Sequence, residues 1–306
     1  MEKLVNSLVA EISKVVLGKE HQIKMALACL FSRGHLLIED QPGMGKTTLA
    51  QTLAKVLGLE YSRVQFTSDL LPADIVGVSI FDQQNSQFSF HPGPIFTQLL
   101  LADEINRTSP KTQSALLEAM EEGQVTIDGD AKKLPSPFFV IATQNPESQD
   151  GTFPLPESQL DRFLMRISLG YPDADVERAL LAGEDPRTRI SELRCLMTPE
   201  KLHAIYQKAG QVQASASLLD YIQRLITYTR TSTEFSYGIS TRGALSLMRC
   251  ARTWAFMHGR GHIIPEDLQI LLPSVVGHRV RDAADYSGQS GYALVERVLN
   301  NVDVIA

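Results

Sequence analysis

The sequence predicts an α/β domain built on a parallel sheet, followed by an all-α domain. In the first half of the 306-residue chain, short apolar runs alternate with amphipathic helical patterns. Strands separated by helices form parallel sheets that are covered on both faces. After the break at Gly170-Tyr171-Pro172 only helical patterns follow. With 43% hydrophobic and 21% charged residues, the chain has the composition of a globular protein with ample core material.

The α/β half begins with a helical pattern, because apolar residues from Leu4 to Val16 recur at spacings of three and four. Helices are also predicted between the apolar runs, most clearly at residues 47–57 and 111–121. We place the domain boundary after residue 171, which gives an α/β domain over 1–171 and a helical domain over 172–306. The parallel sheet is predicted to have five strands, at residues 35–39, 61–66, 99–102, 138–142 and 165–169.

Two segments of the α/β half are predicted to be hairpins inserted into the core. Residues 76–91 carry apolar side chains on both sides of a polar tip at 82–86. Residues 124–134 contain the turn dipeptide Asp128-Gly129 after a short β-type run. Taken alone, each segment could also be a surface loop.

The second half shows three helix starts and no convincing strand. Thr198-Pro199-Glu200 combines a cap residue, a proline at the first helical position and an acid in the first turn. Ser240 precedes an apolar series with helical spacing, and Pro265-Glu266-Asp267 opens a further helix. We therefore expect a helical bundle.

Charge and cysteine content narrow the classes of function. The formal net charge of −6 provides no global positive field for a nucleic acid, so nucleic acid is an unlikely partner. Cys29, Cys195 and Cys250 form no pairing or zinc pattern, and we expect packed, reduced thiols. The N-terminal residues lack a signal-peptide pattern. Since every apolar run is far shorter than the ~20 residues that span a membrane, we expect no membrane span and a cytoplasmic location.

A phosphate-binding loop is predicted after the first strand. The run Asp40-Gln41-Pro42-Gly43-Met44-Gly45-Lys46-Thr47-Thr48 joins that strand to a helix, whose first N–H groups and dipole favour an anion. Gly43 and Gly45 let the backbone approach phosphate oxygens, Lys46 can reach the β and γ phosphates, and Thr47 can bind Mg²⁺. Asp40 departs from the strict pattern, which has glycine at that position.

Polar residues after two further strands complete this prediction. The strand that begins at Leu99 ends in Asp103, which can hold the Mg²⁺ shell, and Glu104, which can take a proton from water. Asn145 follows the next strand and could bond the γ-phosphate or the water, or form a turn before Pro146. Arg162 and Arg242 lie near helix ends, where an arginine taken alone is usually a surface charge.

These residues together resemble the AAA+ ATPases, and among them the MoxR family. The resemblance covers essentially the whole chain and rests on these stretches: Val16-Leu17-Gly18-Lys19, Pro42 to Thr47, Gln65 to Ile75, Leu101 to Glu122, Ala142 to Pro146, Gly151 to Glu157 and Gln159 to Phe163. It implies a P-loop AAA+ core with a five-stranded parallel sheet and a C-terminal all-α lid domain.

The resemblance also implies roles for individual residues. Lys46 and Thr47 match the Walker A motif, and Asp103 and Glu104 match the Walker B motif. Asn145 matches sensor 1, Arg162 the arginine finger offered to a neighbouring subunit, and Arg242 the sensor 2 arginine, although Thr241 stands where proline is common. The hairpins match the helix-2 and pre-sensor-1 insertions, which face the ring's pore in related machines. The expected nucleotide-binding residues are Gly18, Gln41, Pro42, Gly43, Met44, Gly45, Lys46, Thr47 and Thr48.

The function implied by the resemblance is Mg²⁺-dependent ATP hydrolysis in a ring, expected to be a hexamer of this chain. The work would be chaperone-like maturation of protein complexes or metal-cofactor insertion, on a protein client and with a partner that bears a von Willebrand factor type A domain. Three alternatives remain: a nucleic-acid motor of the helix-2-insert group, a small-molecule P-loop kinase, and a module that uses nucleotide only as a switch.

Overall fold

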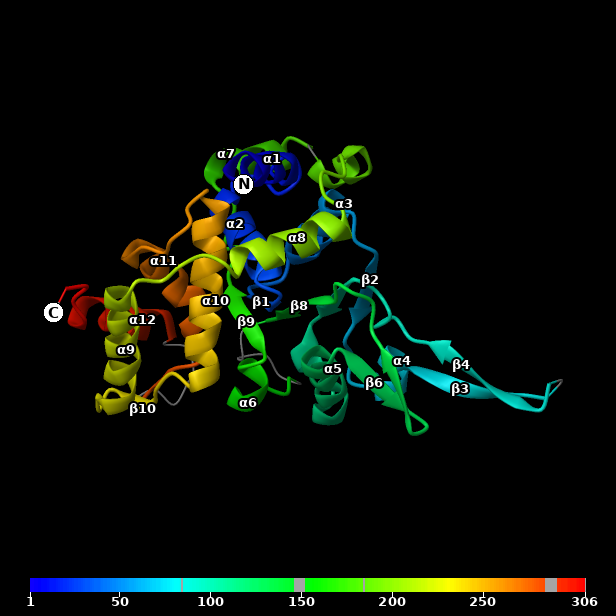
Figure 1. Ribbon diagram of the computed structural model, residues 1–306. Coiled ribbons are helices and arrows are strands. Elements are labelled where there is room, and N and C mark those ends of the chain that lie inside the picture. Colours follow the sequence, from blue (N-terminus) through cyan, green and yellow to red (C-terminus); the bar gives the residue numbers. More distant parts are fainter. Residues whose placement is uncertain (84, 146–151, 184, 284–290, 306) are drawn as a thin grey trace.

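The computed structural model describes residues 1–83, 85–145, 152–183, 185–283 and 291–305. Pro146 and Gly151, which belong to stretches that resemble the MoxR family, lie outside these residues. The fold is an α/β core joined to a helical half (Figure 1).

The core contains the predicted five-stranded sheet. Its strands lie in the order β2-β5-β8-β1-β9, and every neighbouring pair is parallel. This confirms the predicted α/β class and strand number. The bounds are β1 His35–Glu39, β2 Tyr61–Gln65, β5 Leu99–Asp103, β8 Phe139–Gln144 and β9 Phe163–Ile167.

Helices cover both faces of this sheet because alternate side chains of each strand point to opposite faces. Leu36 and Ile38 of β1 pack with apolar residues of the first three helices, while Leu37 packs on the other face with those of α4 and α5. The helix predicted to reach Val16 ends at Ile12, and Val16 is buried after the helix end. The helices of the core are α1 Glu2–Ile12, α2 Glu20–Phe31, α3 Lys46–Leu57, α4 Pro72–Val76, α5 Pro110–Glu122 and α6 Glu157–Leu160.

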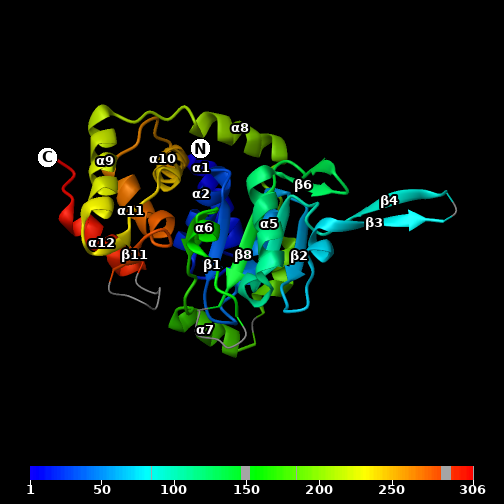
Figure 2. The same ribbon diagram turned by 90° about the horizontal axis from the view of Figure 1, so that it is seen from below.

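Both predicted hairpins are present in the structure. Strands β3 (Gly77–Asp82) and β4 (Gln87–Pro92) pair antiparallel, as do β6 (Gln124–Ile127) and β7 (Asp130–Lys133). The β3–β4 hairpin projects from the core on the side away from the helical half (Figures 1 and 2). Phe81 and Phe88 lie on this projecting ribbon with their ring centroids 5.2 Å apart, and Phe88 is 74% exposed.

The second half is largely helical, as predicted. Its helices are α7 Ala174–Leu181, α8 Pro199–Ala209, α9 Ala216–Thr231, α10 Thr241–Met257, α11 Pro265–Val276 and α12 Gly291–Asn301, with a short 3₁₀ helix at η2 Pro186–Glu192. Another 3₁₀ helix, η1 Ile105–Arg107, lies in the core after β5. The expected start at Ser240 is correct, since its Oγ accepts a hydrogen bond from the Gly243 N–H at 3.0 Å. Helix α11 packs against β9 and α10 against α2, so both halves share one apolar core.

Two expectations are wrong: the absence of strands in the second half, and the packing of all three cysteines. Strands β10 (Phe235–Tyr237) and β11 (Arg281–Asp282) form a small antiparallel pair where no strand was predicted. Such short segments carry too few residues to show a two-residue alternation. Cys29 and Cys250 are buried free thiols as expected, but Cys195 is exposed rather than packed. In the described part of the chain, no helix has both the length and the apolar character to cross a membrane.

Glu11 ties α1 to the chain that enters α8. Its side chain is 2% exposed and accepts hydrogen bonds from the Arg194 N–H at 3.0 Å and from Lys14 Nζ at 2.8 Å. The backbone bond from Arg194, followed by the bond from Lys14, lowers the pKa of Glu11 to about 2. The buried carboxylate is therefore charged over the whole neutral range.

We expect Glu11→Gln to lower the free energy of unfolding at pH 7 by about 2 kcal/mol, because buried bonds to a charged group are lost. The folded-state pKa is depressed, so this contribution is present above the unfolded pKa and disappears as pH falls through about 4.5 toward 2. Urea unfolding of both proteins between pH 7 and 3 measures the difference. The exposed Glu118→Gln is the matched control, and equal losses in the two variants would contradict this role of Glu11.

Candidate nucleotide site

The loop between β1 and α3 has the backbone that an anion site needs. Gly43 and Gly45 adopt φ values of 87° and 86°, in the left-handed region that favours glycine. Helix α3 begins at Lys46, directly after Gly45, so its first N–H groups face the space inside the loop. The predicted phosphate-binding loop therefore has the local geometry for its task.

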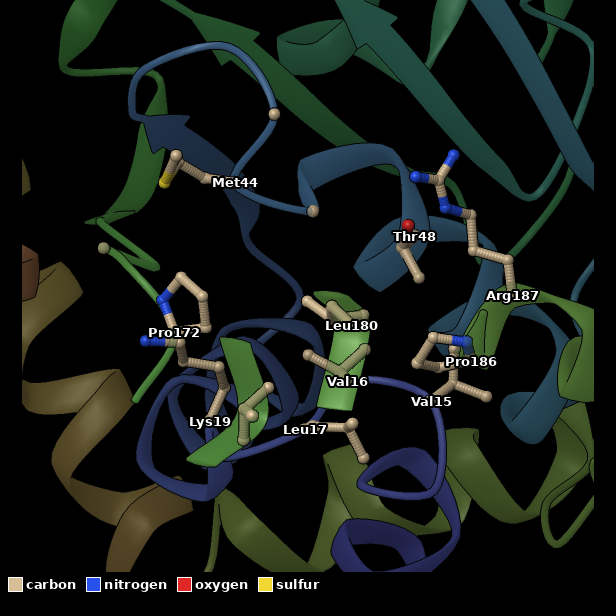
Figure 3. A pocket seen from close by; sticks show the side chains of 14 residues that line it. Val15, Val16, Leu17, Lys19, Met44, Thr48, Pro172, Leu180, Pro186 and Arg187 are labelled. Carbon is tan, nitrogen blue, oxygen red and sulfur yellow. The ribbon is translucent and has the colours of Figure 1, made fainter. Parts of the chain in front are cut away.

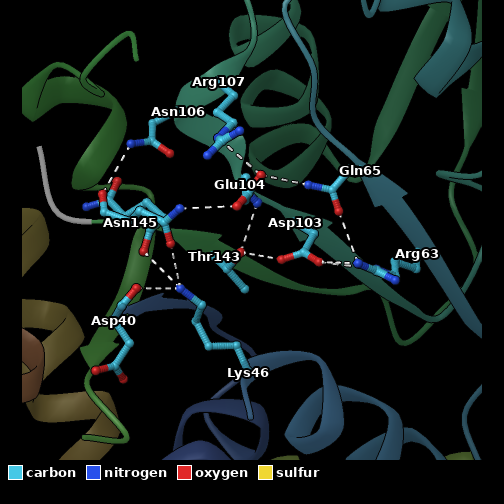
Figure 4. Close-up of polar contacts among 11 residues, drawn as sticks. Asp40, Lys46, Arg63, Gln65, Asp103, Glu104, Asn106, Arg107, Thr143 and Asn145 are labelled. Carbon is cyan, nitrogen blue, oxygen red and sulfur yellow. Dashed lines mark hydrogen bonds and ion pairs between the residues drawn. The ribbon is translucent and has the colours of Figure 1, made fainter. Parts of the chain in front are cut away.

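The Lys46 ammonium is held at the mouth of this loop (Figure 4). Its Nζ donates to the Asp40 carbonyl at 2.5 Å and to Asn145 Oδ1 at 3.0 Å, and the side chain is 7% exposed. Burial lowers the pKa of Lys46, and the surrounding carboxylates, first Asp40, oppose that shift. Asn145 is thereby placed next to the lysine.

Asp103 lies opposite the start of α3, at the carboxyl end of β5. Its Oδ1 accepts from Thr143 Oγ1 at 2.6 Å, and its Oδ2 lies 3.4 Å from Thr47 Oγ1. The guanidinium of Arg63 forms an ion pair with Oδ2 at 2.7 Å. Thr47 and Asp103, the two expected magnesium ligands, thus face each other with hard oxygen atoms.

Glu104 follows Asp103 in a left-handed conformation, with φ of 58°. Its N–H donates to Thr143 Oγ1 at 2.8 Å. Asn145 Nδ2 donates to its Oε1 at 3.1 Å, and Gln65 Nε2 donates to its Oε2 at 2.9 Å. A backbone of this kind costs about 1–3 kcal/mol in a residue other than glycine and is found mainly at functional sites.

Asp40 has a structural role where the strict loop pattern has glycine. Its carboxylate accepts the Ser168 hydroxyl at 2.9 Å, the Gly170 N–H at 3.3 Å and the Leu169 N–H. These three residues follow β9, where the chain leaves the sheet for the helical half. Asp40, the residue that departs from the pattern, thus forms a buried link between the loop and this segment.

Two adjoining cavities flank the loop. The first, about 140 Å³, is lined mainly by apolar groups, among them Val16, Met44 and Leu180 (Figure 3). The second, about 260 Å³, is lined by Lys46, Thr47 and the polar residues that surround them, including Asp103, Glu104 and Asn145. Gly43, Gly45, Thr48 and Arg187 line both. The apolar cavity suits a flat base, and the polar one suits a charged chain of phosphates.

Arg162 and Arg242 lie together in a different hollow. Both form ion pairs with Glu121, at 3.0 Å from Arg162 Nε and 2.6 Å from Arg242 Nη2. Residues that line this hollow include Asp161 and Arg279, and none of its lining residues lines the two cavities at the loop. The structure therefore does not bring these two arginines to the phosphate-binding loop of the same chain.

Two other expected nucleotide contacts also lie outside the cavity linings. Gly18 is flanked by Leu17 and Lys19, which line the apolar cavity, but it packs instead against Asp173 of the segment before α7. Gln41 is exposed and lines neither cavity.

The sequence interpretation missed several site residues. Arg63 and Gln65 are two residues apart on β2, so their side chains share one face of the strand, the face toward Asp103 and Glu104. Thr143 bonds both of those acids from the neighbouring strand. Arg187 comes from η2 in the helical half, and no local pattern linked that segment to the loop. For Arg63 and Gln65, the two-residue spacing along β2 was the signal that could have placed them on one face.

The fold and the site together define a P-loop ATPase domain with an attached helical lid. Residues 35–165 match the sequence profile of the ATPase family associated with various cellular activities, AAA, and residues 227–298 match the AAA lid domain. A crystal structure of a protein from Cytophaga hutchinsonii superposes with a TM-score of 0.87 at 35% identity, covering 100% of this chain and 96% of that one.

Similar sequences identify the family within this class. YeaC of Bacillus subtilis is 42% identical over 306 residues, which are 99% of this chain and 96% of YeaC. Chaperone MoxR1 of Mycobacterium tuberculosis is 36% identical, covering 95% and 79% of the two chains. Protein MoxR of Paracoccus denitrificans is 32% identical, covering 89% and 86%. The chain belongs to the MoxR family of AAA+ ATPases.

Proposed function

We propose that this protein hydrolyses ATP with Mg²⁺ and uses the energy for chaperone-like remodelling of a protein client. The observation that carries the proposal is the position of Glu104. Its carboxylate lies between Asn145 and Gln65, beside the polar cavity that Lys46 and Thr47 also line. An ATP molecule with its base in the apolar cavity and its phosphates in the polar one would present the terminal phosphate to this carboxylate.

The residues at the end of β5 fit a magnesium ion. Thr47 Oγ1 and Asp103 Oδ2 supply the hard oxygen donors that Mg²⁺ prefers, and they leave room for phosphate and water ligands. When bound, the ion would neutralise charge on the phosphate oxygens. Thr143 orients Asp103, and Arg63 shares the same carboxylate.

The remaining steps of hydrolysis are assigned to three side chains, those of Lys46, Asn145 and Glu104. Lys46, whose side chain is largely buried, would place its positive charge against the β and γ phosphates. Asn145 bonds both Lys46 and Glu104, so it would keep the phosphate-binding cation and the base in register. Glu104 would accept a proton from the attacking water.

The separation of Arg162 and Arg242 from the loop supports a ring. A loose phosphoryl-transfer transition state needs positive charge, and an arginine of this type contributes about 10³- to 10⁵-fold in rate. Since both arginines lie in a hollow of their own, we propose that they serve the nucleotide of a neighbouring subunit. A hexamer of this chain, in which each site is completed by its neighbour, accounts for this arrangement.

The projecting β3–β4 hairpin supports a protein client. It projects from the core (Figure 1) and exposes Phe81 and Phe88, and exposed apolar groups of this kind suit contact with another protein. We propose that both hairpins, β3–β4 and β6–β7, face the central pore of the ring, as the matching helix-2 and pre-sensor-1 insertions do in related machines. MoxR1 is named a chaperone. The proposal also includes a partner with a von Willebrand factor type A domain, a cytoplasmic location and a role in metal-cofactor insertion. It places the domain limits at 1–171 and 172–306.

Phosphate release and particle mass test the proposal together. We expect steady-state release of phosphate from ATP that requires Mg²⁺ and stops with EDTA, and a particle mass that rises to a hexamer with ATP. Binding without turnover would indicate a nucleotide switch. Phosphate transfer to a small molecule by a monomer would indicate a kinase, and strong stimulation by DNA would indicate a nucleic-acid motor.

Arg187 is expected to contribute to ATP binding from the helical half. It lines both cavities, so Arg187→Ala should raise KM for ATP about tenfold, the loss expected for a hydrogen bond to a charged group, with a small change in kcat. Initial rates over a range of ATP concentrations measure both constants. Arg178→Ala, an exposed arginine of the neighbouring helix α7, is the control. An unchanged KM would remove Arg187 from the site.

A further inference from the structure

An arginine-lined hollow lies between α2, α8 and α10, away from the nucleotide cavities. These three helices pack against one another in the structure (Figure 1). The hollow has a volume of about 470 Å³ and is lined by Arg33, Arg249 and Arg252 together with apolar residues. No aspartate or glutamate is among its described lining residues. Its volume is that of a small-molecule site.

The local fold brings the three arginines to one hollow. Arg249 and Arg252 are three residues apart on α10, so they lie on the same face of that helix. Arg33 follows the C-terminal end of α2 in a left-handed conformation, with φ of 54°, and its guanidinium stacks 4.7 Å from the centre of the Tyr206 ring. The negative end of α2 and the ring stabilise Arg33.

Arg249 and Arg252 have no acidic partner. Among the residues that the structure describes, neither guanidinium takes part in an ion pair or a hydrogen bond, and Arg252 Nε is a buried donor without an acceptor. Arg33 and Arg249 also line the neighbouring hollow, whose other arginines provide a contrast because they are paired, Arg162 and Arg242 with Glu121 and Arg279 with Asp161. A buried, unpaired donor is costly unless a ligand satisfies it.

We propose that this hollow is a binding site for a small phosphate-bearing molecule, separate from the nucleotide site. Arginine forks match phosphate oxygens in geometry and charge, and three arginines line this hollow. Phe31, Leu245 and Met248 supply an apolar wall for the organic part of such a ligand. Helix α10 begins next to Arg242, so an occupant of this hollow contacts the same helix that carries that arginine.

Pyrophosphate is a suitable probe for this proposal. In calorimetric titrations, the wild-type chain should show two classes of site, and Arg249→Gln/Arg252→Gln should retain only the one at the phosphate-binding loop. In a Lys46→Ala background the hollow alone should bind, and adding the double substitution should weaken binding at least tenfold. Arg178→Gln, on exposed α7, is the matched control.

Several results would overturn the proposal. Unchanged binding in the double variant would do so, as would the absence of pyrophosphate binding to the Lys46→Ala chain. Equal affinity for citrate would show that the hollow does not select phosphate. Loss of binding in Arg242→Gln with retention in the double variant would move the site to the neighbouring hollow. Far-ultraviolet circular dichroism of each variant shows whether the fold is intact before titration. If Lys46→Ala does not fold, the number of pyrophosphate molecules bound by the wild type is compared with the number bound by Arg249→Gln/Arg252→Gln.

Discussion

Glu104→Gln is expected to bind ATP and to hydrolyse it about 10²- to 10⁴-fold more slowly. The amide has nearly the shape of the carboxylate, so it can stay beside Asn145 and Gln65, but it cannot accept a proton from water. Phosphate release under saturating ATP measures the loss, and titration with ATP measures the retained affinity.

Glu122→Gln is the matched control for this experiment, because Glu122 is an exposed acid at the end of α5. Its hydrolysis rate should equal that of the wild type. Unimpaired turnover by Glu104→Gln would show that another group activates the water. A loss of ATP binding would show instead that Glu104 is needed to hold the site together.

Arg162→Ala should lower hydrolysis by about 10³-fold or more within an assembled ring. Arg242→Ala should lower it as well, since both arginines contact Glu121 in the same hollow. The physical reason is the loss of positive charge against the transferring phosphoryl group of the neighbour. Phosphate release is measured after the particle mass has shown that each variant still assembles.

Mixing two inactive variants tests whether the arginines act on a neighbour. Lys46→Ala lacks a working loop but keeps its arginines, whereas Arg162→Ala keeps the loop. Mixed rings should regain hydrolysis at every interface that joins an intact loop to an intact arginine. No recovery in mixed rings, or full activity of assembled Arg162→Ala alone, would refute action between subunits. Arg178→Ala, which carries an exposed arginine of α7, should behave as the wild type.

Regular elements of the core were predictable because their periodicity is strong. The fully buried strand β5 appears as an uninterrupted apolar run, and the strand before the loop was predicted at its observed bounds, His35–Glu39. Residues at strand ends, such as Asp103 and Asn145, could be found because parallel strands bring their carboxyl ends to one edge. The pair β10–β11 lacked such a pattern.

Long-range placement was not available from local patterns. Arg242 is far from Glu121 in sequence, and only the packing of α10 brings them together. Arg187 reaches the loop from η2 in the same way. Arg63 lies on a strand that was correctly predicted, but its partnership with Asp103 depends on the register of β2 with β5, which pairs Arg63 with Leu101 and Gln65 with Asp103.

The link made by Asp40 has a mechanical consequence. One carboxylate holds the start of the phosphate-binding loop to the segment by which the chain leaves β9 for the helical half. If the loop shifts by a fraction of an ångström when it closes on a phosphate, that segment must shift with it. The loop and the chain that enters the helical half are thus coupled through a single side chain. A glycine in place of Asp40 would complete the motif and remove this coupling.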